Sequence, residues 1–245
     1  MTKPTKQWYA SWFDTPYYHI LYKDRDYTEA EAFVAKLSDY LKPTKEQLIL
    51  DLACGKGRHS IHLNRLGANV EGCDYSVNSI NYAKKYNNAT LKFYTHDMRD
   101  ALPKTYDIIL NLFTSFGYFD TNEEHIQTLQ HIYNGLTEGG TFVFDFMNVD
   151  LVVKNLVAKE LIVKEGIEFH IKREVVDGKI TKHIAFEDEQ EQWHYHKEKV
   201  SALDHTTLSD MMSTVGFTGI DTFGDYQLNP FNVESSKRLI MVLRK

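Results

Sequence analysis

The segment that begins at Leu48 constrains the fold of this chain most, because it joins a buried-strand pattern to a glycine-rich turn. It reads LILDLACGKGRHS, and its apolar run over Leu48–Leu52 is broken only by Asp51. A strand buried on both faces of a parallel sheet shows such a run. Gly55 and Gly57 then let the backbone turn sharply and approach a ligand closely. We therefore expect a strand, a tight turn and a helix, with a nucleotide-like ligand as the first hypothesis.

The pattern Asp51-x-Ala53-x-Gly55-x-Gly57 resembles motif I of the class I S-adenosylmethionine-dependent methyltransferases, which usually reads Asp/Glu-x-Gly-x-Gly-x-Gly. The chain departs from it at Ala53, a small residue in place of the first glycine. The resemblance implies a Rossmann-like sheet that binds the methionine part of S-adenosylmethionine over this loop, Cys54 included. The same glycines approximate the dinucleotide fingerprint G-x-G-x-x-G/A, so a nicotinamide-dependent oxidoreductase is a rival hypothesis. A tight turn without any ligand is another.

Two more acidic residues follow predicted strands and favour the methyltransferase hypothesis. Asp74 ends the second strand, where a carboxylate can accept hydrogen bonds from both hydroxyls of a ribose. The alternative for Asp74 is a helix N-cap, a role that Ser76 can fill itself. We expect Tyr75 against the adenine face. In the family that the chain resembles, an acid after the third strand accepts from the adenine amine and the next backbone amide meets a ring nitrogen, which implies these roles for Asp97 and Met98.

The remaining pattern predicts an α/β fold with a mostly parallel Rossmann-like sheet and an antiparallel last strand. We expect Asn111 and Leu112, at the end of the fourth strand, to contact the cofactor. The motif Asn/Asp-Pro-Pro-Tyr/Phe is missing there, which disfavours methylation of DNA adenine or of glutamine. The predicted strands are 48–52, 68–74, 90–95, 106–113, 141–147, 216–223 and 237–243. The predicted helices are 27–41, 58–66, 77–86, 122–136 and 206–215.

Residues 151–203 are surplus to this plan and show the period-two pattern of an antiparallel sheet. Asp177-Gly178 predicts a two-residue hairpin turn that pairs Val175 with Ile180 and gathers the apolar residues on one face. That face has to be covered by the main domain or by a second subunit. We expect an inserted lid over the ends of the parallel strands that selects the substrate, with dimerisation as the alternative. The cofactor-binding domain is then 1–150 with 204–245, including an N-terminal helical cap at 1–42.

Two roles are open for the aromatic-rich segment 8–22. Its side chains either pack an N-terminal helix on the sheet or form a flap over cofactor and substrate. Catalytic candidates in this segment are Tyr17, Tyr18, His19 and Tyr22, and Arg25 is a candidate partner for the cofactor carboxylate.

Eleven histidines raise the question of a metal, but their spacing does not support a site. His59 and His62 lie three residues apart on a predicted helix without a third ligand, so we interpret them as polar surface. His194 and His196 share one face of a predicted strand, where plain sheet surface and a polar contact to substrate are both open. We expect no bound metal.

Composition narrows the choice of partners. The chain has 245 residues and a net charge of −6, without the basic stripe that nucleic-acid binders use to neutralise phosphates, so we expect a small-molecule substrate and no nucleic acid. It has neither an 18-residue apolar run nor a signal-peptide core, which predicts a cytoplasmic protein with no membrane partner. Two cysteines make a disulfide framework improbable.

These observations together predict an enzyme that transfers a methyl group from S-adenosylmethionine to O or N of a small molecule by in-line displacement. Alternatives are a protein that binds S-adenosylmethionine without catalysis and, less favoured, the nicotinamide-dependent oxidoreductase. Assembly as a homodimer stays open.

Overall fold

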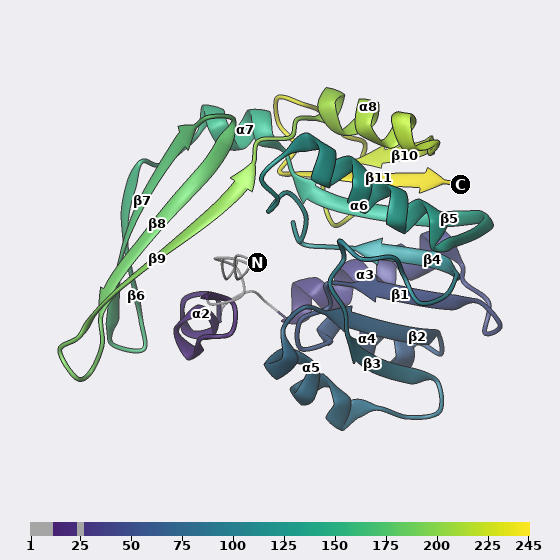
Figure 1. Ribbon diagram of the computed structural model, residues 1–245, viewed down its shortest axis with the longest axis horizontal. Helices are drawn as coiled ribbons and strands as arrows, with labels where there is room; N and C mark the ends of the chain where they lie inside the picture. Colours follow the sequence, from purple (N-terminus) through teal and green to yellow (C-terminus); the bar gives the residue numbers. More distant parts are fainter. Residues whose placement is uncertain (1–11, 24–26) are drawn as a thin grey trace, which may run out of the picture.

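The computed structural model describes residues 12–23 and 27–245, which form two β-sheets with helices packed around them (Figure 1). The strands are β1 (Leu48–Leu52), β2 (Asn69–Asp74), β3 (Leu91–Thr95), β4 (Tyr106–Asn111), β5 (Leu136–Met147), β6 (Lys159–Lys164), β7 (Ile167–Val176), β8 (Lys179–Glu187), β9 (Trp193–Ser201), β10 (Thr218–Phe223) and β11 (Arg238–Arg244). The helices are α2 (Pro16–Leu21), α3 (Tyr27–Leu41), α4 (Arg58–Arg65), α5 (Val77–Ala83), the short 3₁₀ helix η1 (Lys84–Tyr86), α6 (Asn122–Asn134), α7 (Val149–Lys154) and α8 (His205–Val215).

The larger sheet has seven strands in the order β10-β11-β5-β4-β1-β2-β3. Strands β1 to β5 pair in parallel, whereas β11 runs antiparallel to both β5 and β10. The predicted fold class, including the antiparallel last strand, is therefore confirmed. The chain order reverses at β1, which has β2 on one side and β4 on the other. Ligands of open α/β sheets bind beyond the carboxyl ends of the strands at such a reversal.

Helices cover both faces of the larger sheet and complete its core. One face packs on α3, α4 and α5 through buried residues such as Phe33, Leu63 and Ile80. The other packs on α6 and α8, where Leu129 and Met212 are buried. Strand β1 is buried on both sides, as its continuous apolar run predicts. None of the described helices is long and apolar enough to cross a membrane.

Strand β5 starts earlier than predicted. The pattern suggested a turn at Gly139-Gly140 with the strand after it, but Leu136 already pairs with Tyr106, and the register shifts before Ile108 pairs with Thr141. Leu136 is buried, which explains why the backbone joins the sheet at once.

The smaller sheet, here called the inserted sheet, has the order β6-β7-β8-β9 and is antiparallel throughout. Val175 pairs with Ile180 and Ile171 with Ile184, so the predicted hairpin register is confirmed. Strand β6 and helix α7 are additions that the sequence did not predict.

The N-terminal segment covers the apolar face of the inserted sheet. Trp12 and Leu21 form one buried cluster with residues of β7 and β8, among them Phe169 and Phe186. Figure 1 shows α2 between the inserted sheet and the ends of the parallel strands. A cover of this kind needs no second subunit.

Candidate functional site

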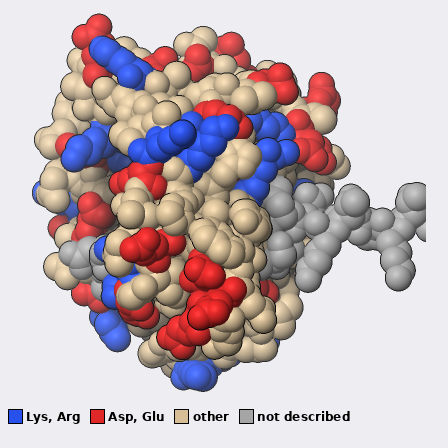
Figure 2. Space-filling model, turned by 90° about the vertical axis from the view of Figure 1, so that its left-hand side faces the viewer, with Lys and Arg blue, Asp and Glu red and all other residues tan. Residues whose placement is uncertain are grey.

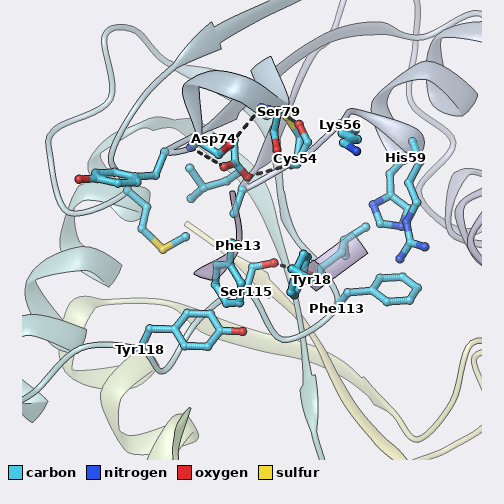
Figure 3. A pocket seen from close by; sticks show the side chains of 18 of the residues that line it. Phe13, Tyr18, Cys54, Lys56, His59, Asp74, Ser79, Phe113, Ser115 and Tyr118 are labelled. Atoms are coloured by element: carbon cyan, nitrogen blue, oxygen red, sulfur yellow. Dashed lines mark hydrogen bonds between the residues drawn. The ribbon is translucent and has the colours of Figure 1, made fainter. Parts of the chain in front are cut away.

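A cavity of about 470 Å³ opens beyond the ends of β1, β2, β3 and β4 (Figure 3). Asp74 and Cys54 lie on one side of it, with Tyr18 and Tyr118 across from them. The structure brings most of the predicted site residues to this cavity, namely Tyr18, His19, Tyr22, Ala53, Cys54, Gly55, Asp74, Tyr75, Asp97, Met98 and Leu112. Four others do not line it: Tyr17, Asp51, Gly57 and Asn111.

The two glycines of the turn have different surroundings, although both have a positive φ. A Cβ built on Gly55 (φ 57°) meets no atom within 4 Å, so this residue presents bare backbone to the cavity. A Cβ on Gly57 (φ 82°) would lie 2.6 Å from the ring of Phe93. Gly55 thus allows a ligand to approach, whereas Gly57 allows α4 to begin close to the sheet.

Asp74 ties the glycine loop to the start of α5. One carboxylate oxygen accepts from the amide of Gly55 and the other from the amide of Ser76, both at 2.8 Å. Ser76 caps α5 by accepting from the amide of Ser79. Burial raises the pKa of Asp74, and its two backbone hydrogen bonds oppose that shift. Ser76 caps the helix as predicted, but Asp74 also accepts a hydrogen bond from this turn. Each carboxylate oxygen of Asp74 keeps a lone pair for a ribose hydroxyl.

Asp97 is held by Arg99. The guanidinium donates to both carboxylate oxygens, with the shortest contact, 2.6 Å, from Nη2 to Oδ2. Burial raises the pKa of Asp97, but the hydrogen bonds and charge of Arg99 outweigh it, so the pKa lies below the usual range. The carboxylate is therefore ionised and fixed beside Met98 at the cavity wall.

Asp51 and Asn111 lie beneath the glycine loop instead of facing the cavity. Asp51 is 1% exposed and accepts from the hydroxyl of Ser60 at 2.5 Å. Burial raises the pKa of Asp51 to about 6. Asn111, also buried, donates to the carbonyl of Leu52 at 3.0 Å and so joins β4 to the end of β1. The sequence assigned both to the cofactor, but the structure gives them a supporting place.

A basic and aromatic wall was missed from the sequence. Lys23, Lys56, Arg58, His59 and Phe113 all line the cavity. The expectation of a surface position is wrong for His59, which is 6% exposed and stacks on Phe113 at 4.8 Å between ring centroids. Burial lowers the pKa of His59 to about 3, so the imidazole is neutral. Its place at the second position of α4, directly after the glycine loop, could have indicated from the sequence that His59 lies near the ligand.

A strained turn after β4 presents Phe113 to the cavity. Phe113 and Thr114 both have left-handed backbones, with φ near 60°. The buried carboxylate of Asp145 accepts from the amide of Phe113 at 2.8 Å and pairs with Arg238 at 2.7 Å. Arg238 also donates to the hydroxyl of Thr114. Such a backbone persists where its surroundings fix it from several sides, and it is common at functional sites.

Helix α2 supplies the wall opposite the strand ends, so the aromatic segment both packs and lines the cavity. Tyr18, His19 and Tyr22 face the cavity. Tyr17 instead packs on Phe186 at 4.6 Å and donates to Asp188. Burial and the charge of Lys56 lower the pKa of His19. Arg25 and the residues before Trp12 lie outside the described residues.

The inserted sheet meets the cavity only indirectly. Of its described residues, none lines the cavity. His194 and His196 lie under α2, where both stack on Phe186. These two histidines are thus part of the packing between α2 and the inserted sheet.

The donor and acceptor groups fit a nucleoside-containing cofactor. A carboxylate with spare lone pairs stands at the end of β2, a second carboxylate follows β3, and bare backbone faces the cavity at Gly55. These groups suit a ribose diol, an exocyclic amine and a close backbone approach respectively. With the sheet order described above, they define a Rossmann-like protein that binds such a cofactor.

Comparison with known proteins identifies a methyltransferase domain. Residues 49–140 match a family model described as a methyltransferase domain. A glycine/sarcosine N-methyltransferase of Aphanothece halophytica is 26% identical over 212 residues, which cover 83% of this chain and 77% of that protein. A dTDP-3-amino-3,4,6-trideoxy-alpha-D-glucopyranose N,N-dimethyltransferase of Streptomyces venezuelae is 30% identical over 132 residues, or 52% of this chain and 54% of that protein. Residues 49–140 are thus a methyltransferase domain, and its cofactor is S-adenosylmethionine.

Solved structures share the whole fold. A S-adenosylmethionine-dependent methyltransferase from Clostridium acetobutylicum ATCC 824 aligns with a TM-score of 0.77 at 16% identity, covering 93% of this chain and 95% of that chain. The sugar N-methyltransferase KedS8 from Streptoalloteichus sp ATCC 53650 aligns with a TM-score of 0.69 at 18% identity, covering 93% of each chain. At these identities the likeness concerns the fold, and it includes the inserted sheet.

Proposed function

We propose that the methyl acceptor is a small amine that also carries an anionic group. The observation that supports this most is the positive charge on the cavity wall, where Lys56 and Arg58 lie in and directly after the glycine loop, and Lys23, which pairs with Glu165, follows α2. One cation can pair with the carboxylate of the cofactor, and the remaining positive charge favours an anionic acceptor. The names of the two relatives above, which are N-methyltransferases, support nitrogen over oxygen.

The residues of this chain contribute binding, orientation and one proton acceptor. When bound, S-adenosylmethionine supplies a methyl group on a sulfonium that needs no further activation. Asp74 and Asp97 are proposed to hold the ribose and the adenine, with Tyr75, Met98 and the loop backbone around them. Correct orientation of the reactants is worth about 7–11 kcal/mol in favourable cases.

An amine arrives largely as its ammonium form and must lose a proton before it can attack. The lowered pKa of His19 leaves a neutral imidazole nitrogen on the cavity wall to accept that proton. Among the three catalytic candidates that face the cavity, His19 therefore fits this role best. Tyr18 and Tyr22 are proposed to orient the acceptor.

The test is a panel of acceptors assayed for release of S-adenosylhomocysteine. Glycine, sarcosine and an amino-sugar phosphate represent anionic amines, their methyl ester or neutral counterparts lack the anion, and hydroxy acids offer oxygen only. We expect turnover with anionic amines and at least tenfold lower kcat/KM with their neutral counterparts. Turnover restricted to hydroxyl acceptors contradicts the proposal. Calorimetric binding of S-adenosylmethionine without turnover of any acceptor supports the non-catalytic alternative, and binding of NADH in its place supports the oxidoreductase.

We further propose that the protein forms a homodimer through the outer face of the inserted sheet. That face, which points away from α2, exposes Leu161, Val163, Trp193 and Tyr195. Figure 2 shows basic side chains above acidic ones on this side of the molecule. By strand register, the basic end includes Lys172, Lys197 and Lys199, and the acidic end includes Glu168 and Glu187. A second copy turned end for end would match these charges.

The proposed setting of the reaction is the cytoplasm, with a small molecule and no nucleic acid as partner. The composition supports the absence of nucleic acid, since the net charge of −6 gives no general attraction to phosphates.

A further inference from the structure

Tyr22 connects the inserted sheet to the cavity. It follows α2 directly and lines the cavity, yet its hydroxyl points to β8 and β9. The hydroxyl donates to the carboxylate of Glu198, with 2.7 and 2.8 Å to the two oxygens. It accepts from the ammonium of Lys182 at 2.6 Å. One phenol is thus held by two charged side chains of the inserted sheet.

The surroundings make these contacts strong and specific. The side chains of Lys182 and Glu198 are only 14% and 15% exposed, and they lie 4.0 Å apart. The Lys182 ammonium also stands over the ring of Tyr22, 4.6 Å from its centroid. Trp12 donates to the same carboxylate at 2.6 Å and belongs to the apolar cluster around it. Hydrogen bonds to charged groups are about twice as strong as neutral ones and fix geometry.

We propose that Lys182 and Glu198 are positioning residues that hold the Tyr22 ring in the acceptor wall, so that the inserted sheet controls acceptor fit through this phenol. The inference rests on the proposed function, because it assumes that the acceptor binds on the α2 side of the cavity. It follows from the geometry because the sheet contributes no described residue to the cavity, whereas Tyr22 touches both. A change in the inserted sheet at Lys182 or Glu198 then reaches the acceptor by moving the Tyr22 ring; Lys23, which also lines the cavity and pairs with Glu165 beside β6, is a separate and more exposed contact.

A competing account gives the same contacts a structural role only, in which they attach α2 to the sheet and acceptor binding is indifferent to the Tyr22 hydroxyl. The two accounts differ in how mutations combine. If Lys182 acts through the Tyr22 hydroxyl, removing both groups must raise the acceptor KM no more than removing either one alone. If Lys182 only contributes stability, its loss leaves the KM for acceptor unchanged.

The experiment is a double-mutant cycle with Lys182→Met, Tyr22→Phe and their combination. Both changes keep the size of the side chain. Lys104→Met, which breaks a partly exposed ion pair with Glu71 in the larger sheet and does not line the cavity, is the matched control. Each variant is measured for KM and kcat with the best acceptor of the panel, for S-adenosylhomocysteine affinity by calorimetry, and for amide hydrogen exchange over α2.

We expect Lys182→Met and Tyr22→Phe each to raise the acceptor KM about tenfold, with no further rise in the double variant and cofactor affinity within twofold of the parent. Lys104→Met should change none of these. Additive effects, or faster exchange in α2 with an unchanged KM, overturn the proposal. Glu198→Gln serves as a second variant if Lys182→Met does not fold. Should only hydroxyl acceptors be turned over, the proposed acceptor class fails, and the same cycle run with that acceptor still decides this inference.

Discussion

Asp74 bonds two backbone amides and also lines the cavity, so its substitution has a defined expected effect. Asp74→Asn keeps the shape but turns one acceptor into a donor that faces an amide N–H. Losing a hydrogen bond to a charged group costs about 1.5–3 kcal/mol, so we expect S-adenosylhomocysteine to bind about 10- to 100-fold more weakly in calorimetry. The control is Asp107→Asn, because the Asp107 carboxylate likewise accepts from a backbone amide, that of Leu48, but at the other end of β1. Unchanged affinity in the Asp74 variant contradicts its proposed contact with the cofactor.

We expect Asp74 also to make cofactor binding depend on pH. The ribose hydroxyls need an ionised acceptor, and burial raises the pKa of Asp74 above that of an ordinary aspartate. As the pH falls through that raised pKa, the carboxylate takes up a proton and binding weakens. We expect the loss of affinity to begin at a higher pH than for an aspartate in water, and Asp74→Asn to remove this dependence.

Asp51 is expected to lower the stability of the fold at neutral pH. Because its pKa is about 6 in the folded protein and about 4 when unfolded, the folded state binds the proton more tightly. Stability then falls as the pH rises from about 4 to 6, by about 3 kcal/mol at most. Asp51→Asn should therefore raise the free energy of unfolding at pH 8 and have little effect at pH 4. Urea unfolding at both values measures this; an equal effect at both excludes the ionisation as its cause.

Some site residues could be predicted from the sequence and others could not, for a physical reason. Asp74 is the last residue of β2 and Asp97 comes two residues after β3, and all such strand ends meet at one edge of the sheet. The direction of a side chain within a turn or helix is set by packing instead. Hence Tyr17 turns to Phe186, Asp51 points beneath the loop, and His59 is buried at the cavity, none of which the spacing reveals.

At the scale of elements, the glycine turn gives a prediction that separates binding from folding. Gly55→Ala adds a methyl group toward open cavity and a left-handed strain of about 1–2 kcal/mol, so it should reduce cofactor affinity with a modest loss of stability. Gly57→Ala drives a Cβ into Phe93 and adds about 1–3 kcal/mol of overpacking to the same strain. Melting temperature and calorimetric affinity measured on both variants test this. Equal losses of stability contradict the assignment.

The parallel strands were predictable because β1, β4 and the second half of β5 are apolar runs and because acids lie at or just after the ends of β2 and β3. The β7–β8 hairpin was predictable because Asp177-Gly178 fixes its register. Strand β6 was not. It lies at the edge of the inserted sheet, where Leu161 and Val163 are exposed and Ile162 is the residue that packs inward, so its alternation carries little contrast. Edge strands are specified by their neighbour more than by their own sequence.

At the scale of the whole molecule, the outer face of the inserted sheet predicts self-association. Tyr195, 74% exposed, is the most exposed large apolar side chain described. Tyr195→Glu should convert a dimer into a monomer in analytical ultracentrifugation, because it places a charge amid apolar surface. High salt should weaken the parent dimer, since the opposed charges are exposed. The exposed Tyr82→Glu on α5 is the control, and a parent that is monomeric at all concentrations contradicts the dimer.

The bond from Trp12 to Glu198 spans 186 residues, whereas that from Gly55 to Asp74 spans 19. Closing the longer loop costs about 2 kcal/mol more in chain entropy. During synthesis, α2 leaves the ribosome long before β7 and β8, on which it packs. Its apolar side chains therefore stay unpacked through most of translation. The nucleoside half of the pocket can form while the rest is still being made, and the acceptor half is completed late. A refolding chain should therefore regain cofactor binding before it regains turnover.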